Sequence, residues 1–327
     1  MSGLADLVSL SGLTERVTLV GYRSGWSLVR RMPGCLAYQV FDVMADVAWV
    51  RRGKGVERMR SNYATVRPEL TPAELDALVR AGMRSYLRYW CDSFRLPDRS
   101  VDELIHGVRV VGVDAVREHL KSGRSVVVFL GHLGNWDVAG AWSTTELAPV
   151  TTVAERLKPE ELFDEFVAFR EGLGMRIIPL TGGSDVFREL TQACRSGALI
   201  ALLADRDLTN GGIEVDFCGE RARMAVGPAA LALNAGAALF PGMVHYERQP
   251  AGHGWRTVVT FHDPVVPPVQ GTSREKIRAM TQACADVLSQ AVREHTHDWH
   301  MMQRVFTKDL LEDRASGQVP EKAGGSA

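Results

Sequence analysis

His132 and Asp137 are the two side chains of this sequence best placed to do chemistry together. A carboxylate beside an imidazole fixes the tautomer of the ring and stabilises its protonated form, as a general base requires. On a continuous helix, residues five positions apart point about 140° away from each other. The pair can therefore meet only if the segment after His132 is not helical, and Gly131 and Gly134 permit such a turn. We predict that Asp137 orients His132 as a general base.

A hydrophobic strand followed by a helix must position this pair. Residues Val126–Leu130 are continuously apolar, as in a strand of a parallel sheet that is buried on both faces. Asn135 is a suitable N-cap for a helix over Trp136–Leu147. Asp137 then lies in the first helical turn, where the helix dipole favours an ionised carboxylate. We expect backbone N–H groups of this turn to stabilise an oxyanion, and Asn135 and Trp136 to contact substrate.

Composition and charge exclude several classes of protein. The chain has 327 residues, of which 46% are hydrophobic and 24% charged, enough for one large or two small domains. A net charge of −1 argues against nucleic-acid binding. The cysteines form no CxxC pair, so we expect buried thiols in a reducing compartment and no metal site. We find no signal peptide and no run of about 18 apolar residues that would span a membrane.

The first hundred residues are expected to be helical, and they are rich in arginine. Helices are predicted over residues 14–31 and 35–50, and a third begins at Thr71, which starts a capping box. Apolar, aromatic faces flanked by arginines suit insertion at an anionic bilayer surface. Packing of these helices onto the rest of the protein is an equal alternative, and both can hold for different faces.

From about residue 107 strands and helices alternate. This predicts an α/β fold with a central, mostly parallel sheet flanked by helices, and with an N-terminal helical layer. We expect the layer to span residues 1–100, the α/β core 101–312 and a disordered tail 313–327, as one integrated domain plus the tail. The strand candidates are residues 109–111, 126–130, 151–154, 176–179, 198–204, 214–217, 238–246 and 256–262. The helix candidates are residues 113–121, 159–172, 184–195, 227–235 and 273–294.

An acidic and basic cluster at the end of one apolar strand is a further candidate for the site. Asp205, Arg206 and Asp207 follow the strand predicted over residues 198–204. Ligands of α/β proteins bind at this edge of the sheet. A structural ion pair is the alternative.

Basic residues near another strand could bind phosphate. Arg156 and Lys158 follow the strand predicted over residues 151–154, and ordinary surface charge explains them equally well. Arg170 lies on the next helix, where it binds phosphate or pairs with Glu165 or Glu171.

Three histidines near the C-terminus have the residue type of metal ligands. His295, His297 and His300 match no familiar zinc spacing and have few acidic neighbours. We expect a solvated helix end here.

Six stretches of the sequence occur in an order and spacing that resemble a known family. They are the His-x4-Asp motif at residues 132–137 and the segments 153–159, 169–174, 203–208, 212–219 and 227–233. Together they resemble the bacterial late lipid A acyltransferase family of the glycerolipid acyltransferase superfamily. The likeness covers roughly residues 10–310 and is greatest to the actinobacterial branch, the phosphatidylinositol mannoside acyltransferases. That branch often carries Glu where this chain has the shorter Asp205.

The resemblance implies an acyl-CoA-dependent O-acyltransferase. It would move a long-chain fatty acyl group from acyl-CoA to a mannose hydroxyl of a phosphatidylinositol mannoside. The protein would be peripheral, on the anionic cytoplasmic face of the inner membrane, with acyl-CoA as co-substrate and no other cofactor. The implied catalytic residues are His132, Asp137 and Asp205. The implied substrate-binding residues are Arg156, Lys158, Arg170, Arg206, Asn135 and Trp136.

Three alternatives remain open. The acceptor could be another glycolipid or a lysophospholipid, although we find no F-P-E-G-like motif of the lysophosphatidate enzymes. Water in place of the sugar would make the protein a thioesterase. A non-catalytic lipid-binding or membrane-scaffold protein could retain the same fold. The chain has no G-x-S-x-G motif, so an acyl-enzyme on serine is not expected.

Overall fold

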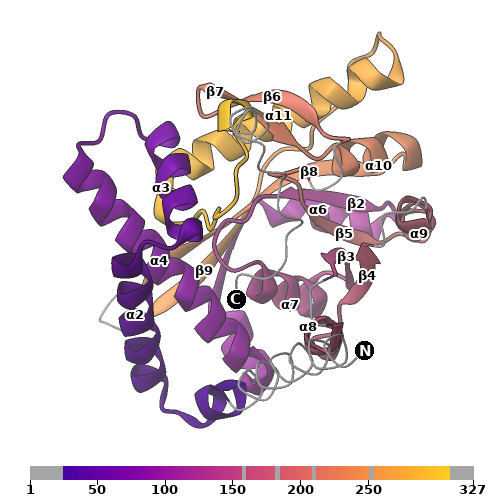
Figure 1. Ribbon diagram of the computed structural model, residues 1–327. Helices are drawn as coiled ribbons and strands as arrows, with labels where there is room; N and C mark the ends of the chain where they lie inside the picture. Colours follow the sequence, from indigo (N-terminus) through magenta and orange to yellow (C-terminus); the bar gives the residue numbers. More distant parts are fainter. Residues whose placement is uncertain (1–24, 157–159, 181–184, 208–210, 250–253, 310–327) are drawn as a thin grey trace, which may run out of the picture.

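A seven-stranded sheet forms the centre of the structure, a computed structural model that describes residues 25–156, 160–180, 185–207, 211–249 and 254–309 (Figure 1). The strand order is β1-β9-β8-β2-β5-β3-β4, and every pairing is parallel except that of β8 with β9. The predicted α/β class with a mostly parallel sheet is confirmed. The strands are β1 Val108–Val111, β2 Val126–Leu130, β3 Val150–Glu155, β4 Arg176–Leu180, β5 Leu199–Leu203, β8 Ala238–Arg248 and β9 Trp255–Phe261.

An antiparallel hairpin of β6 (Ile213–Phe217) and β7 (Glu220–Met224) lies outside this sheet. The sequence pattern predicted β6 but not β7. Three of the five residues of β7 are charged, so its sequence has only a weak pattern of apolar residues.

Helices cover both faces of the sheet. Alternate residues of β2 face opposite ways: Val126 and Val128 belong to the core cluster on one face, and Val127 and Phe129 to the cluster on the other. The prediction of a strand buried on both faces is therefore confirmed. The first face is covered by α6 (Val113–Lys121), α7 (Trp136–Glu146) and α8 (Glu160–Gly172), and the second by α9 (Asp185–Cys194), α10 (Gly227–Ala235) and α11 (Ser273–Glu294).

The N-terminal layer is helical, as predicted. Residues 25–31 are helical, and α4 begins with the predicted capping box at Thr71. Residues 1–24, which include most of the first predicted helix, and the predicted tail lie outside the described residues. Two helices, α3 and α5, were not predicted. The helices of the layer are α2 Gly34–Arg51, α3 Lys54–Val66, α4 Pro72–Arg95 and α5 Val101–His106, with a 3-10 turn, η1, at Leu96–Asp98.

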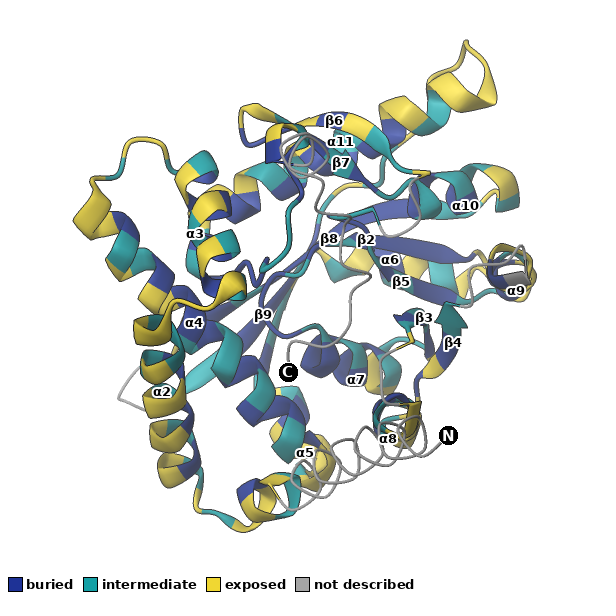
Figure 2. Ribbon diagram, in the orientation of Figure 1, coloured by how far each residue is buried: buried dark blue, intermediate teal, exposed yellow. Residues whose placement is uncertain are grey.

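The two faces of α2 differ in their surroundings. One face packs against α4 through Ala37, Phe41 and Ala45, and Asp46 is paired with two arginines of α4. The opposite face is exposed along the outer edge of the molecule (Figure 2). Its exposed apolar residues are Leu36, Val40, Val43, Met44, Val47 and Val50. Within the described ranges, no helix has the length and hydropathy to cross a membrane.

Candidate active site

His132 is paired with Asp205. The imidazole Nδ1 lies 2.6 Å from Oδ1 of Asp205, and the backbone N–H of His132 donates to Oδ2 at 2.8 Å. The Asp205 side chain is fully buried, whereas 17% of the His132 side chain is exposed. Burial disfavours a charged carboxylate, but the charge and hydrogen bonds of His132 outweigh it and lower the pKa of Asp205. The ionised Asp205 thus holds a proton on Nδ1 and leaves Nε2 as the basic nitrogen.

The predicted pairing of His132 with Asp137 is wrong. Asp137 lies in the first turn of α7, as predicted, but its carboxylate is buried and accepts hydrogen bonds from Tyr89 and Arg170 at 2.7 and 2.8 Å. Asp137 therefore ties the start of α7 to α4 and α8. Arg170 was predicted to bind phosphate or to pair with Glu165 or Glu171, and in the structure it pairs with Asp137.

The pairing with Asp205 follows from the strand order. β2 and β5 are parallel neighbours, so their carboxyl ends meet at one edge of the sheet. His132 comes two residues after the end of β2, and Asp205 two residues after the end of β5. The carboxylate reaches the imidazole in spite of its short side chain.

The turn between β2 and α7 is fixed by Gly134 and Asn135. Gly134 has φ +63°, and a Cβ there would lie 2.5 Å from the carbonyl oxygen of Val244 in β8, so only glycine fits. Asn135 caps α7 through Val138 N–H, as predicted, and its amide lies 3.2 Å from the hydroxyl of Tyr246. Because Asn135 is fully buried and fully engaged, this conformation does not present it to a substrate.

The backbone N–H groups of the turn are also engaged. His132 N–H donates to Asp205, Leu133 N–H to Gly131 O, and Gly134 N–H to Asp298 O. These groups therefore hold the turn together, and the predicted oxyanion site is not present in them.

An apolar cavity lies between α7 and the sheet, close to the His132–Asp205 pair. Trp136 lines the cavity, and its ring stands edge-on to the imidazole of His132 with the centroids 5.5 Å apart. Asp137 and Arg170 also border the cavity. The remaining walls are mostly aliphatic and include Val128, Leu130, Ala139, Gly140, Ala201 and Val244.

The other predicted basic residues lie near the same edge of the sheet. Arg206 is mostly buried and donates to Glu155 at 3.0 Å and to Gln303. Arg156 is half-exposed and pairs with Glu160, whereas its neighbour Glu155 pairs with Arg206. Lys158 lies outside the described residues.

The segment after α11 is buried against the site, which corrects the predicted solvated helix end. His300 is 5% exposed, and its Nε2 lies 3.0 Å from the hydroxyl of Ser85. Burial lowers the pKa of His300 to about 3, so the ring is neutral. His295 stacks on His245 with the ring centroids 3.8 Å apart. The described residues contain no cluster suited to a metal ion.

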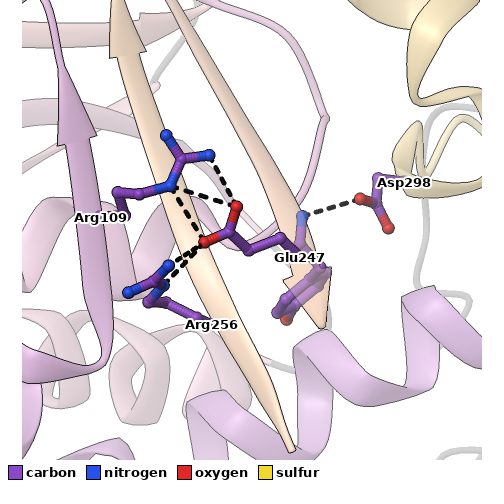
Figure 3. Close-up of polar contacts among 5 residues, drawn as sticks. Arg109, Glu247, Arg256 and Asp298 are labelled. Carbon is purple, nitrogen blue, oxygen red and sulfur yellow. Dashed lines mark hydrogen bonds and ion pairs between the residues drawn. The ribbon is translucent and has the colours of Figure 1, made fainter. Parts of the chain in front are cut away.

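Asp298 connects this segment to β8. Its carboxylate accepts a hydrogen bond from the backbone N–H of Tyr246 in β8 at 2.8 Å, and a dashed line marks this contact in Figure 3. The next residue, Glu247, accepts hydrogen bonds from Arg109 of β1 and Arg256 of β9 (Figure 3). These hydrogen bonds lower the pKa of Glu247 to about 2, and the bond from Arg109 has the largest effect. The side chain of Glu247 thereby links β1, β8 and β9.

Tyr89, Asp298 and Trp299 were not predicted to belong to the site. Their own spacing gives no signal, because each reaches the turn from a distant element. Only a fold that brings α4 and the C-terminal segment to the end of β2 makes them neighbours of His132.

Known proteins resemble this chain over nearly its whole length. Residues 13–308 match the family described as bacterial lipid A biosynthesis acyltransferase. The phosphatidylinositol mannoside acyltransferase of Mycolicibacterium smegmatis is 42% identical over 312 residues, which are 94% of this chain and 98% of that protein. The protein of the same name from Mycobacterium tuberculosis (strain H37Rv) is 40% identical over 307 residues, 93% of each chain. The chain therefore belongs to the bacterial lipid A biosynthesis acyltransferase family, and it is an acyltransferase.

Proposed function

We propose that the protein transfers a long-chain fatty acyl group from acyl-CoA to a mannose hydroxyl of a phosphatidylinositol mannoside. The observation that carries the chemistry is the His132–Asp205 pair beside an apolar cavity. The acceptor is supported by the two relatives named phosphatidylinositol mannoside acyltransferase, which are 42% and 40% identical over almost the whole chain.

His132 is the general base of this reaction. A sugar hydroxyl is a poor nucleophile, so Nε2 removes its proton as the oxygen attacks the thioester carbonyl. Asp205 stabilises the imidazolium that forms. The new C–O bond replaces the C–S bond, and the leaving thiolate takes the proton back from the imidazolium. The histidine returns to its neutral form, and no acyl-enzyme is needed.

We infer that the acyl chain of the donor enters the apolar cavity, whose volume of about 80 Å³ must widen to take a long chain. Its aliphatic lining suits hydrocarbon, and Trp136 joins it to His132, so a chain in the cavity places its thioester near the base. Arg156 and Arg206 lie at the same edge of the sheet and are suited to phosphates of the donor or acceptor.

The exposed face of α2 supports binding of the protein to the membrane that contains the acceptor. Six apolar side chains on one face of this helix are exposed, and arginines flank it at both ends. Such a surface inserts shallowly into a bilayer, and the basic residues favour anionic lipids. The protein is peripheral, on the cytoplasmic face of the inner membrane, where acyl-CoA is available.

The test is acyl transfer with purified components. The protein is incubated with palmitoyl-CoA and a mannosylated phosphatidylinositol in anionic vesicles, and the lipid products are resolved by mass. We expect an acylated mannoside from the wild type and from His106→Ala, an exposed control histidine, and none from His132→Ala. Acylation of other glycolipids alone would refute the acceptor. Release of free fatty acid without acceptor would show a thioesterase, and lack of any turnover would refute the enzyme.

A further inference from the structure

The C-terminal segment around Trp299 runs antiparallel to the turn that carries His132. The N–H of Gly134 donates to Asp298 O at 2.8 Å, and the N–H of His300 donates to His132 O at 2.7 Å. Leu133 and Trp299 form an isolated antiparallel bridge between these two bonds. Trp299 is thereby held directly beside the turn.

The indole of Trp299 completes the hydrogen bonding of Asp205. Its Nε1–H donates to Oδ2 at 3.0 Å, beside the bond that the same oxygen accepts from the His132 backbone. The other oxygen, Oδ1, faces Nδ1 of His132. Two N–H donors on one oxygen fix the rotation of the carboxylate, so that the second oxygen lies in line with the imidazole.

We propose that Trp299 is a positioning residue for acyl transfer, whose indole N–H directs the Asp205 carboxylate at His132. The inference rests on the proposed function of His132 as the base. Trp299 touches the base only through Asp205, and it does not line the apolar cavity among the described residues. Its effect should therefore fall on kcat and on pH dependence and spare the KM for acyl-CoA.

A role in packing alone is the alternative, and experiment can separate it from positioning. Trp299 is fully buried, and its ring centroid lies 5.6 Å from that of Phe217 and 6.4 Å from that of Phe306. Phenylalanine at this position keeps an aromatic ring against these neighbours and removes only the N–H donor and part of the ring volume.

Loss of the donor changes the proton affinity of the pair in one direction. Without the N–H donor on Oδ2 the carboxylate can rotate out of line with the imidazole, and it then stabilises the neighbouring imidazolium less strongly. His300 interacts electrostatically with His132 and is kept neutral by burial; Asp298 raises its pKa, and Arg88 and His297 lower it. The acidic limb of the pH–rate profile should therefore move to lower pH.

The experiment compares Trp299→Phe with Trp142→Phe, a buried tryptophan of α7 that serves as the packing control. For Trp299→Phe we expect kcat to fall at least tenfold, KM for palmitoyl-CoA to stay within twofold, and the acidic limb to move down by about half a pH unit or more. Trp142→Phe should leave the acidic limb in place. An unchanged profile for Trp299→Phe, or a loss of stability alone, would overturn the proposal.

A second measurement does not depend on turnover. The pKa of the His132 ring is followed by NMR titration of its nitrogen shifts in the wild type and in Trp299→Phe. A lower pKa in the variant supports the positioning role even if no mannoside is acylated, in which case only the proposed function fails. An equal pKa in the two proteins refutes the positioning role even if the wild type acylates the mannoside.

Discussion

Replacing Asp205 with asparagine should remove most of the acyl transfer while the fold is retained. Oδ2 of Asp205 accepts N–H donors from the His132 backbone and from Trp299 at 2.8 and 3.0 Å. An amide has one acceptor oxygen and one NH₂ group. The oxygen must stay with the two N–H donors, so the NH₂ group faces Nδ1 of His132. Nδ1 must then accept, which moves the imidazole proton to Nε2, and the ring can no longer act as a base.

The size of the loss follows from this change of tautomer. The equivalent Asp→Asn substitution in a serine protease lowers kcat about 10⁴-fold for the same reason. We expect a loss of about 10³- to 10⁴-fold here, equal to roughly 4–5 kcal/mol of transition-state stabilisation. The KM for acyl-CoA should change little, because Asp205 does not line the apolar cavity among the described residues.

Asp137→Asn is the matched comparison, and its expected phenotype is the opposite. Asp137 is a buried partner of Arg170 and Tyr89 and has no contact with the imidazole in this structure. Weakening a buried ion pair should cost roughly 3 kcal/mol of stability, or about 5 °C or more in Tm. The protein that remains folded should keep kcat within about tenfold.

The assay measures kcat and KM with palmitoyl-CoA and a mannosylated phosphatidylinositol, and Tm for the same preparations. The reasoning would be refuted if Asp205→Asn kept near-normal kcat while folded Asp137→Asn lost it. Asp137, and not Asp205, would then orient the base.

Three further results are expected. Val43→Asp combined with Val47→Asp on α2 should weaken binding to anionic vesicles more than about tenfold in a flotation assay without lowering Tm, whereas Val269→Asp, at an exposed site elsewhere, should not. Gly140→Ala places a methyl 2.8 Å from a methionine sulfur in the cavity wall, so kcat/KM should fall more for palmitoyl-CoA than for decanoyl-CoA. The fold lowers the pKa of His300 to about 3, so the unfolding free energy should decrease as pH falls from the unfolded value of about 6.5, by up to about 1.4 kcal/mol per unit. In denaturant titrations of His300→Gln the free energy of unfolding should decrease less steeply with falling pH. An equal slope would contradict the lowered pKa of His300.

The elements of the core could be predicted because their patterns are strong. The boundaries of β2, α6, α10 and α11 agree with the prediction, since continuous apolar runs, Gly-Pro starts and a Thr-x-x-Glu capping box are local signals. The long helix α4 begins where its capping box indicates. β7 was missed because it is a short strand in which three of five residues are charged, and α3 was missed although its buried residues Val56, Met59, Tyr63 and Val66 have helical spacing.

The partner of His132 could not be predicted from local pattern. The sequence offers Asp137 five residues away and Asp205 seventy-three residues away, and spacing favours the nearer residue. The deciding fact is that β2 is hydrogen-bonded to β5, with β3 beyond it, and this order is a property of the whole sheet. The family resemblance implied that Asp205 is a catalytic residue, but it did not identify His132 as the residue that Asp205 contacts.

The same tertiary contacts make the helical layer part of the active site. Tyr89 of α4 donates to Asp137, Ser85 of α4 donates to Asp298, and Tyr63 of α3 donates to the carbonyl oxygen of Trp299. Each acceptor is buried, so without the layer these groups would lose partners that they require. The layer and the α/β core should therefore unfold in one transition, detected together by tryptophan fluorescence and by hydrogen exchange in α4 and β2. Separate transitions would show that the layer is an independent unit, and that the site is held by the sheet alone.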